Sequence, residues 1–189
     1  PSTDFFTGYA SRLPASLASA EWSGVAQLAA NIHECWLQKR QVFICGNGGS
    51  AGNAIHLAND FLYGIAKRPG GGLRVNALSA NPAVITCLAN DIGYERIYSE
   101  QLSVMANPDD VLIVLSGSGN SPNIVAALEQ AKAMNVKSYA ILGFSGGRSK
   151  QLADVPIHFS VDDMQISEDL QLVVGHMLMQ WLYDNRPKL

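Results

Sequence analysis

The run Gln41-Val42-Phe43-Ile44-Cys45, followed at once by Gly46-Asn47-Gly48-Gly49-Ser50, decides the fold. The first five residues are mostly apolar and stop at a glycine, as expected of a strand buried on both faces. The glycine-rich segment predicts a tight turn, which we call turn 1 (residues 46–50), and residues 50–63 have a helical pattern. A buried strand, a short turn and a helix form the repeating unit of a parallel α/β sheet.

The same alternation continues to the end of the 189 residues. Further strand-like runs lie at residues 73–78, 111–115, 138–142 and 155–159, with helical patterns at 82–89, 95–105, from 121 onward and at 165–183. Two amphipathic helical patterns, residues 5–20 and 21–39, precede the first strand. We therefore expect one domain over residues 1–189, with two N-terminal helices (1–40) and an α/β core (41–189). The core should be a three-layer αβα sandwich around a five-stranded parallel sheet.

A second glycine-rich connection from a strand to a helix occurs later in the chain. Turn 2 (residues 116–121, Ser-Gly-Ser-Gly-Asn-Ser) follows the apolar run 111–115, and Ser121 with Pro122 is a favourable helix start. Parallel sheets bind ligands at the carboxyl ends of their strands, where both turns must lie. Glycine amides, hydroxyls and helix N-termini together suit a phosphate monoester.

Composition limits the classes of function. The formal net charge is −3 and no run of Lys or Arg occurs, which argues against duplex nucleic acid as a partner. No apolar stretch approaches the roughly 20 residues that span a bilayer, so we expect no membrane association. Three cysteines without CxxC spacing, and opening residues unlike a signal peptide, predict a cytoplasmic protein.

Other readings of the turns are weaker. Either turn alone could be a plain strand-to-helix connection. Gly46, Gly48 and Gly52 loosely imitate a dinucleotide fingerprint, but the second strand ends at Leu78-Ser79 without the acid that would hold a ribose. The chain also contains no GxxxxGK[ST] segment, which excludes a nucleoside-triphosphate P-loop.

Three segments carry a family resemblance: Cys45 to Ser50, Asn90-Asp91-Ile92-Gly93-Tyr94, and Asp110 to Ser121. At these residues, and over nearly its whole length, the chain resembles the sugar-isomerase (SIS) domain superfamily. Within it, the chain is most similar to the phosphoheptose isomerase family, which converts sedoheptulose 7-phosphate to the aldose heptose 7-phosphate. The resemblance implies a homotetramer with active sites at subunit interfaces and a sugar phosphate as substrate.

The resemblance also implies roles for individual residues. It assigns phosphate binding to Ser50, Ser116, Ser118 and Ser121, and sugar contacts to Asn47 and Asp91, with Gly48, Gly49 and Gly117 completing the substrate site. It implies a zinc ion held by His56, Asp60, Glu168 and His176. Two imidazoles and two carboxylates are an acceptable zinc set.

The acid–base pair for an enediol mechanism would be Asp60 and His176, because a partly buried carboxylate or imidazole can titrate near working pH. The implied zinc-ligand set differs from that of the family at two residues: Asp60 replaces a Glu, and Glu168 replaces a Gln. Helical spacing leaves Asp169 as an alternative to Glu168, since it lies closer to the face of His176.

Two further departures concern the sugar end: Gly64 replaces a family Arg, and Gln165 replaces an Asp. Together with Asp60 in place of the family's Glu, they leave two other functions open. One is an isomerase for a different ketose phosphate. The other is a non-catalytic SIS module, like the relative that binds the bacterial replication initiator as a scaffold.

Overall fold

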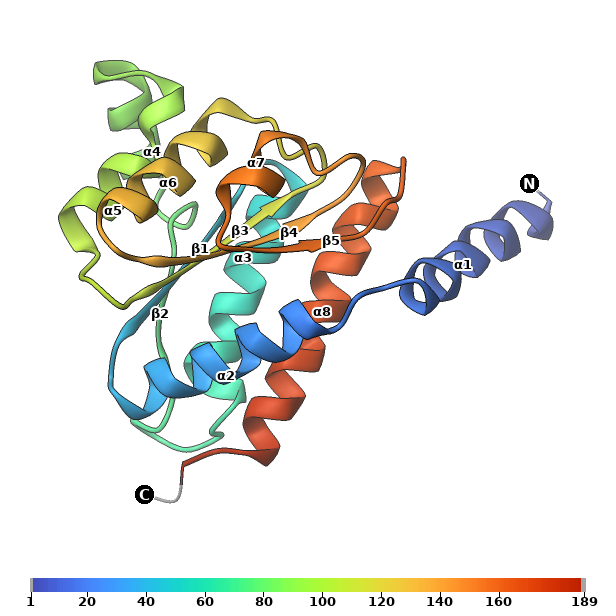
Figure 1. Ribbon diagram of the computed structural model, residues 1–189, viewed down its shortest axis with the longest axis horizontal. Coiled ribbons are helices and arrows are strands. Elements are labelled where there is room, and N and C mark those ends of the chain that lie inside the picture. Colours follow the sequence, from blue (N-terminus) through green and yellow to red (C-terminus); the bar gives the residue numbers. More distant parts are fainter. Residues whose placement is uncertain (1, 188–189) are drawn as a thin grey trace.

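The computed structural model describes residues 2–187, and within them a five-stranded parallel sheet forms the centre of the molecule (Figure 1). The strands are β1 (Gln41–Gly46), β2 (Arg74–Ala77), β3 (Val111–Ser116), β4 (Lys137–Leu142) and β5 (Val155–His158). They lie in the order β2-β1-β3-β4-β5, and every neighbouring pair is parallel. The chain order reverses direction between β1 and β3, which is where such sheets bind ligands.

Alternate residues of the central strands face two separate cores. Ile44 and Ile113 point to one side, together with helices α2 (Ser23–Leu37), α3 (Gly49–Asn59) and α8 (Met164–Asp184). Phe43 and Leu112 point to the other side, where α5 (Ser99–Met105), α6 (Pro122–Ala133) and α7 (Gly147–Leu152) lie. Period-two side-chain alternation in strands that are buried on both faces produces the expected three layers.

Two helices stand away from this body in Figure 1: α1 (Thr3–Ala18) at one end and α4 (Pro82–Asp91) at the other. Neither helix has a buried residue. The exposed fractions of Phe5 and Phe6 on α1 are 71% and 60%. Each helix packs against a core through partly buried residues only, Tyr9, Leu13 and Leu17 on α1 and Ile85, Leu88 and Ala89 on α4, so their outer faces remain uncovered.

The structure corrects the expected elements in three places. The helix expected over residues 50–63 changes at Asp60 from α-helix to a π-helical segment, η1 (Asp60–Gly64), in which the Ile65 amide donates to the Asp60 carbonyl. The helix expected over 95–105 is divided into a 3₁₀ turn, η2 (Tyr94–Arg96), and α5. Helix α7 was not predicted, because its six residues carry little apolar periodicity.

Among residues 2–187, none of the helices combines the length and apolarity needed to cross a membrane. Cys35, Cys45 and Cys87 are all free thiols, and burial raises the pKa of Cys35 to about 11.

Candidate active site

Turn 2 forms a cradle of hydroxyls and amides between β3 and α6. The Ser116 hydroxyl accepts a hydrogen bond from the Gly119 amide, and the Ser118 hydroxyl accepts one from the Asn120 amide. Ser121 occupies the N-cap position of α6 with Pro122 after it, as predicted, but its hydroxyl makes no capping hydrogen bond. That hydroxyl is therefore available to a ligand at the helix N-terminus, where negative charge is favoured.

Glycine is required at turn 2 for space as well as conformation. Gly119 has φ +67°, and a Cβ there would lie 2.0 Å from the Gly146 carbonyl oxygen. Gly117 is buried, and a Cβ there would meet the sulfur of Met164 at 2.6 Å. The cradle is thus packed closely from behind by the segment before α7 and by the start of α8.

Turn 1 lies beside turn 2 but is built differently. Gly46 lies against Ser50, which is buried, and a Cβ on Gly46 would be 2.7 Å from the Ser50 backbone. Gly48 has φ +55° and open space around the position of a Cβ. The chain can therefore turn sharply from β1 into α3 and leave a backbone surface open at Gly48.

A polar network joins the two turns. The side-chain amides of Asn47 and Asn123 form a reciprocal pair, each nitrogen 2.8 Å from the other oxygen. The hydroxyl of Tyr94 lies 3.2 Å from the Asn47 oxygen, and that of Tyr98 is 2.5 Å from the Gly46 carbonyl. Asn47 was expected to contact a sugar hydroxyl, and here most of its hydrogen-bonding capacity orients turn 1 against α6.

Glu168 reaches the start of α3. A Cβ on Gly49 would lie 2.3 Å and 2.4 Å from the two carboxylate oxygens of Glu168, so glycine leaves the space that this carboxylate fills. The Glu168 backbone carbonyl also accepts a hydrogen bond from the Asn53 amide. A carboxylate at a helix N-terminus is electrostatically favourable and would repel a second anion at the same place.

Three of the four predicted metal ligands lie together further from the turns, where His56 of α3 and Asp60 of η1 meet His176 of α8. The Nε2 atoms of His56 and His176 are 2.9 Å apart, and the nearer Asp60 oxygen lies 3.4 Å from His56 and 3.7 Å from His176. We call these three residues the His–Asp cluster; their ligand atoms all lie within 4.8 Å of one another. The imidazoles are half exposed, whereas 18% of the Asp60 side chain is exposed.

Neither predicted fourth ligand joins this cluster. Glu168 is eight residues before His176 on α8, which is about 12 Å along the helix axis. Asp169 accepts a hydrogen bond from the Tyr9 hydroxyl at 2.5 Å, which raises the Tyr9 pKa to about 12. Within one chain, the expectation of a four-residue set is therefore corrected to three residues, with Glu168 at turn 1 instead.

Asp91 lies apart from both turns, at the end of α4. In the described part of the chain, its carboxylate accepts a hydrogen bond from Asn90 and lies 3.6 Å from the Cys87 sulfur. Tyr94, three residues later, is the member of this segment that reaches turn 1.

Sequence reasoning missed Asn123, Tyr94 and Tyr98 as parts of the site. Asn123 is buried in the first turn of α6, directly after Ser121-Pro122, so its place beside turn 2 could have been predicted from the sequence. Tyr94 belongs to a segment already singled out for the resemblance. Tyr98 gave no local signal, because its role depends on η2 folding back onto the end of β1.

Known proteins resemble this chain in sequence and in fold. The family model of the SIS domain matches residues 5–143. A phosphoheptose isomerase of Helicobacter pylori is 38% identical over 73% of this chain and 71% of its own length, and one of Chlorobaculum parvum is 34% identical over 91% and 83%. The structure of a phosphoheptose isomerase from Francisella tularensis superposes with a TM-score of 0.90 at 28% identity, covering 98% of this chain and all of the other. The chain therefore belongs to the phosphoheptose isomerase family of SIS-domain proteins.

Proposed function

We propose that this protein is an aldose–ketose isomerase that converts sedoheptulose 7-phosphate to D-glycero-D-manno-heptose 7-phosphate through an enediol. The observation that carries the proposal is the pairing of a hydroxyl-lined phosphate cradle with the His–Asp cluster in a member of this family. The first holds the unreactive end of the substrate, and the second carries groups that can move a proton.

Turn 2 binds the phosphate. Ser118 and Ser121 offer hydroxyls, α6 offers its N-terminus, and Gly117 and Gly119 let a ligand approach the backbone. Turn 1, with Glu168 and the Asn47–Asn123 pair beside it, is better suited to neutral sugar hydroxyls than to the phosphate, so the phosphate contact expected of the buried Ser50 is not part of this proposal. Binding energy from the phosphate then positions the reacting carbons.

Asp60 and His176 form the acid–base pair. The largely buried Asp60 carboxylate removes the proton from the carbon next to the carbonyl, and the His176 imidazole, 3.7 Å away, exchanges a proton with the neighbouring oxygen. The same two groups return the protons in the opposite sense to complete the isomerisation. His56, 2.9 Å from His176, fixes the orientation of the second imidazole.

The His–Asp cluster also fits a zinc ion. Two imidazole Nε2 atoms and one carboxylate oxygen converge on the same point, and three protein ligands with an open position are typical of a catalytic zinc. A bound zinc would supply a Lewis acid for the substrate carbonyl oxygen. His56, Asp60 and His176 would hold it; the second oxygen of the Asp60 carboxylate would remain free to act as the base, whereas His176, with its Nε2 on the metal, would no longer exchange a proton there.

The active site requires a second copy of the chain. Eleven residues of helix separate Gly49 from Asp60, which is about 16 Å along the axis, and turn 2 lies beyond turn 1. A seven-carbon sugar phosphate spans only about 10 Å when extended. The turns of one copy must therefore work with the His–Asp cluster of another, as in the proposed homotetramer.

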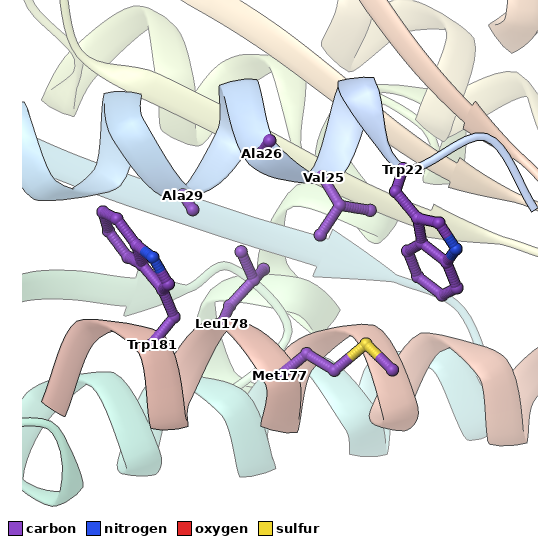
Figure 2. A pocket seen from close by; sticks show the side chains of 7 residues that line it. All are labelled: Trp22, Val25, Ala26, Ala29, Met177, Leu178 and Trp181. Carbon is purple, nitrogen blue, oxygen red and sulfur yellow. The ribbon is translucent and has the colours of Figure 1, made fainter. Parts of the chain in front are cut away.

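Exposed apolar residues surround the cluster and mark where that copy would dock. Ile55, Leu62 and Tyr63 flank it on α3 and η1. On α8, Met177 leads into an apolar groove of about 300 Å³ between α2 and α8, with Trp22 and Trp181 at its ends (Figure 2). The apolar N-terminal end of α1 and the uncovered α4 are the complementary surfaces that a second copy presents.

Incubation with sedoheptulose 7-phosphate, followed by NMR detection of the aldose, tests the proposal directly. We expect product with the wild-type protein, loss of product after zinc is chelated, and no detectable turnover for Asp60→Asn with substrate binding retained. Binding without turnover by the wild-type protein would favour the scaffold alternative. Turnover of another ketose phosphate alone would favour the alternative suggested by Gly64 and Gln165 at the sugar end.

Mixing two inactive variants tests the shared site. Asp60→Asn removes the cluster, and Ser118→Asp places a negative charge in turn 2. After the two variants are unfolded and refolded together, random assembly should restore about a quarter of wild-type activity if a site uses two copies. A site within one chain predicts no recovery. We further propose a cytoplasmic location, on the basis of the three free thiols.

A further inference from the structure

Helices α3 and α8 run side by side in the same direction, and their contact places the His–Asp cluster. Contacts pair Gly49 with Glu168 at one end and Gly64 with Met179 at the other. Between them, the Asn53 amide donates to the Glu168 carbonyl and to the Gln171 side-chain oxygen, both at 3.0 Å. The register of α8 against α3 is therefore fixed by polar contacts one to two turns before His176.

Gly175 sets the separation of the two helices at the cluster. A Cβ at this position would lie 2.2 Å from one terminal methyl of Leu57, 2.7 Å from the other and 3.0 Å from Cγ. Leu57 is 2% exposed and belongs to the core, so its side chain has no solvent space to move into. A Cβ at position 175 would force Leu57, α8 or both to shift, and because the core confines Leu57 we expect α8 to move away from α3.

These two residues adjoin the ligands. Gly175 directly precedes His176 on α8, and Leu57 directly follows His56 on α3. The Nε2 atoms of the two histidines are 2.9 Å apart, so an increase in helix separation would open the cluster directly. The carboxylate that completes the cluster is an Asp, which is one methylene shorter than the Glu of the family. If α8 moved away, this shorter side chain could not extend far enough to keep its distance to His176.

We propose that Gly175 is a positioning residue: by allowing α8 to lie against Leu57 without an intervening Cβ, it gives the helix separation at which the short Asp60 side chain can share a site with His56 and His176. This inference rests on the proposed role of the cluster. It assigns to Gly175 and Leu57 a function beyond packing, and it makes the glycine a structural complement of the Asp at position 60.

Zinc titration of the full chain, starting from metal-free protein, tests the proposal. We expect Gly175→Ala to weaken zinc binding by about 10- to 100-fold, as is typical when groups that orient ligands are altered. The turnover rate should fall with it, while KM for the sugar phosphate changes little, because turn 2 is remote. Leu57→Ala in the Gly175→Ala background removes the obstructing methyls and should recover most of the zinc affinity.

A second compensating substitution tests whether Gly175 and Asp60 depend on each other. Asp60→Glu should restore zinc affinity in the Gly175→Ala variant, because the longer carboxylate spans the wider gap. The same substitution in the wild-type background should give no gain. Leu178→Ala is the matched control: Leu178 is a buried α8 residue that faces α2, so it should lower the melting temperature without changing zinc affinity.

Equal zinc affinity for Gly175→Ala and the wild-type protein would overturn the inference, as would a loss that neither Leu57→Ala nor Asp60→Glu restores. A crystal structure of metal-free Gly175→Ala gives an independent answer. We expect the His56–His176 Nε2 separation to increase, and an unchanged separation would contradict the role of Gly175. If the wild-type protein bound no zinc, the metal assignment would fail, and this crystallographic comparison would still decide the inference.

Discussion

Turn 1 and turn 2 look alike in the sequence, and the structure gives them opposite electrostatic surroundings. Both connect a buried parallel strand to a helix through glycines and at least one serine. At turn 2 the α6 N-terminus has the free Ser121 hydroxyl beside it. At turn 1 the α3 N-terminus faces the Glu168 carboxylate across Gly49. The same local motif therefore suits an anion at turn 2, whereas at turn 1 the helix N-terminus already faces a carboxylate.

The difference arises from the residues of α8 that pack against each turn. Helix α8 begins near turn 2, where Met164 lies against Gly117, and passes turn 1 one helical turn later, so the Glu168 side chain lies at the start of α3. Nothing within turn 1 itself predicts this. A glycine-rich turn indicates that a ligand can approach the backbone, and the tertiary neighbour decides which ligand is accepted.

The largest effect should come from adding a methyl group to the two left-handed glycines. Gly119→Ala forces a Cβ to 2.0 Å from a carbonyl oxygen at φ +67°, so we expect the free energy of unfolding to fall by about 3 kcal/mol or more. Gly48→Ala has open space and should cost about 2 kcal/mol, from its backbone conformation alone (φ +55°, ψ −121°). Urea denaturation measures both. Equal losses would show that turn 2 is not packed from behind as described.

A smaller effect is expected from removing one hydroxyl at each turn. Ser118→Ala deletes a donor to a charged phosphate and should raise KM about tenfold with little change in kcat, because the bond is present in ground and transition states alike. Ser50→Ala, at the start of α3, should leave KM nearly unchanged. The assay is steady-state kinetics with sedoheptulose 7-phosphate. A larger effect at Ser50 would exchange the roles of the two turns.

The smallest effect concerns inorganic phosphate. Wild-type protein should bind one phosphate per chain, at turn 2, when titrated calorimetrically. Glu168→Gln removes the competing negative charge from turn 1, so a second and weaker phosphate site should appear there. A stoichiometry that stays at one after this substitution would mean that the geometry of turn 1, rather than Glu168, excludes the anion.

Much of the architecture could be predicted from the sequence. The strands at residues 41–45 and 111–115, the glycine turns after them and the Ser121-Pro122 helix start were all identified from local pattern. Helix α7 and the π-helical segment at Asp60 were not, because short helices and changes of helix type leave little periodicity.

The site was predicted in part. His56 and Asp60, four residues apart, and His176 on the last helix do converge. The placement of Glu168 could not be foreseen, because spacing along one helix does not reveal which level of another helix it meets. The separation of the turns from the His–Asp cluster, by contrast, follows from the eleven helical residues between Gly49 and Asp60 and could have been calculated from the sequence.

The most direct measurement of the central claim is a crystal structure of Asp60→Asn soaked with sedoheptulose 7-phosphate. The account predicts phosphate density on the Ser118 and Ser121 hydroxyls of turn 2, with the carbonyl end of the sugar beside His56 and His176 of a second copy. Phosphate at turn 1 against Glu168, or a sugar that never approaches any His–Asp cluster, would contradict it.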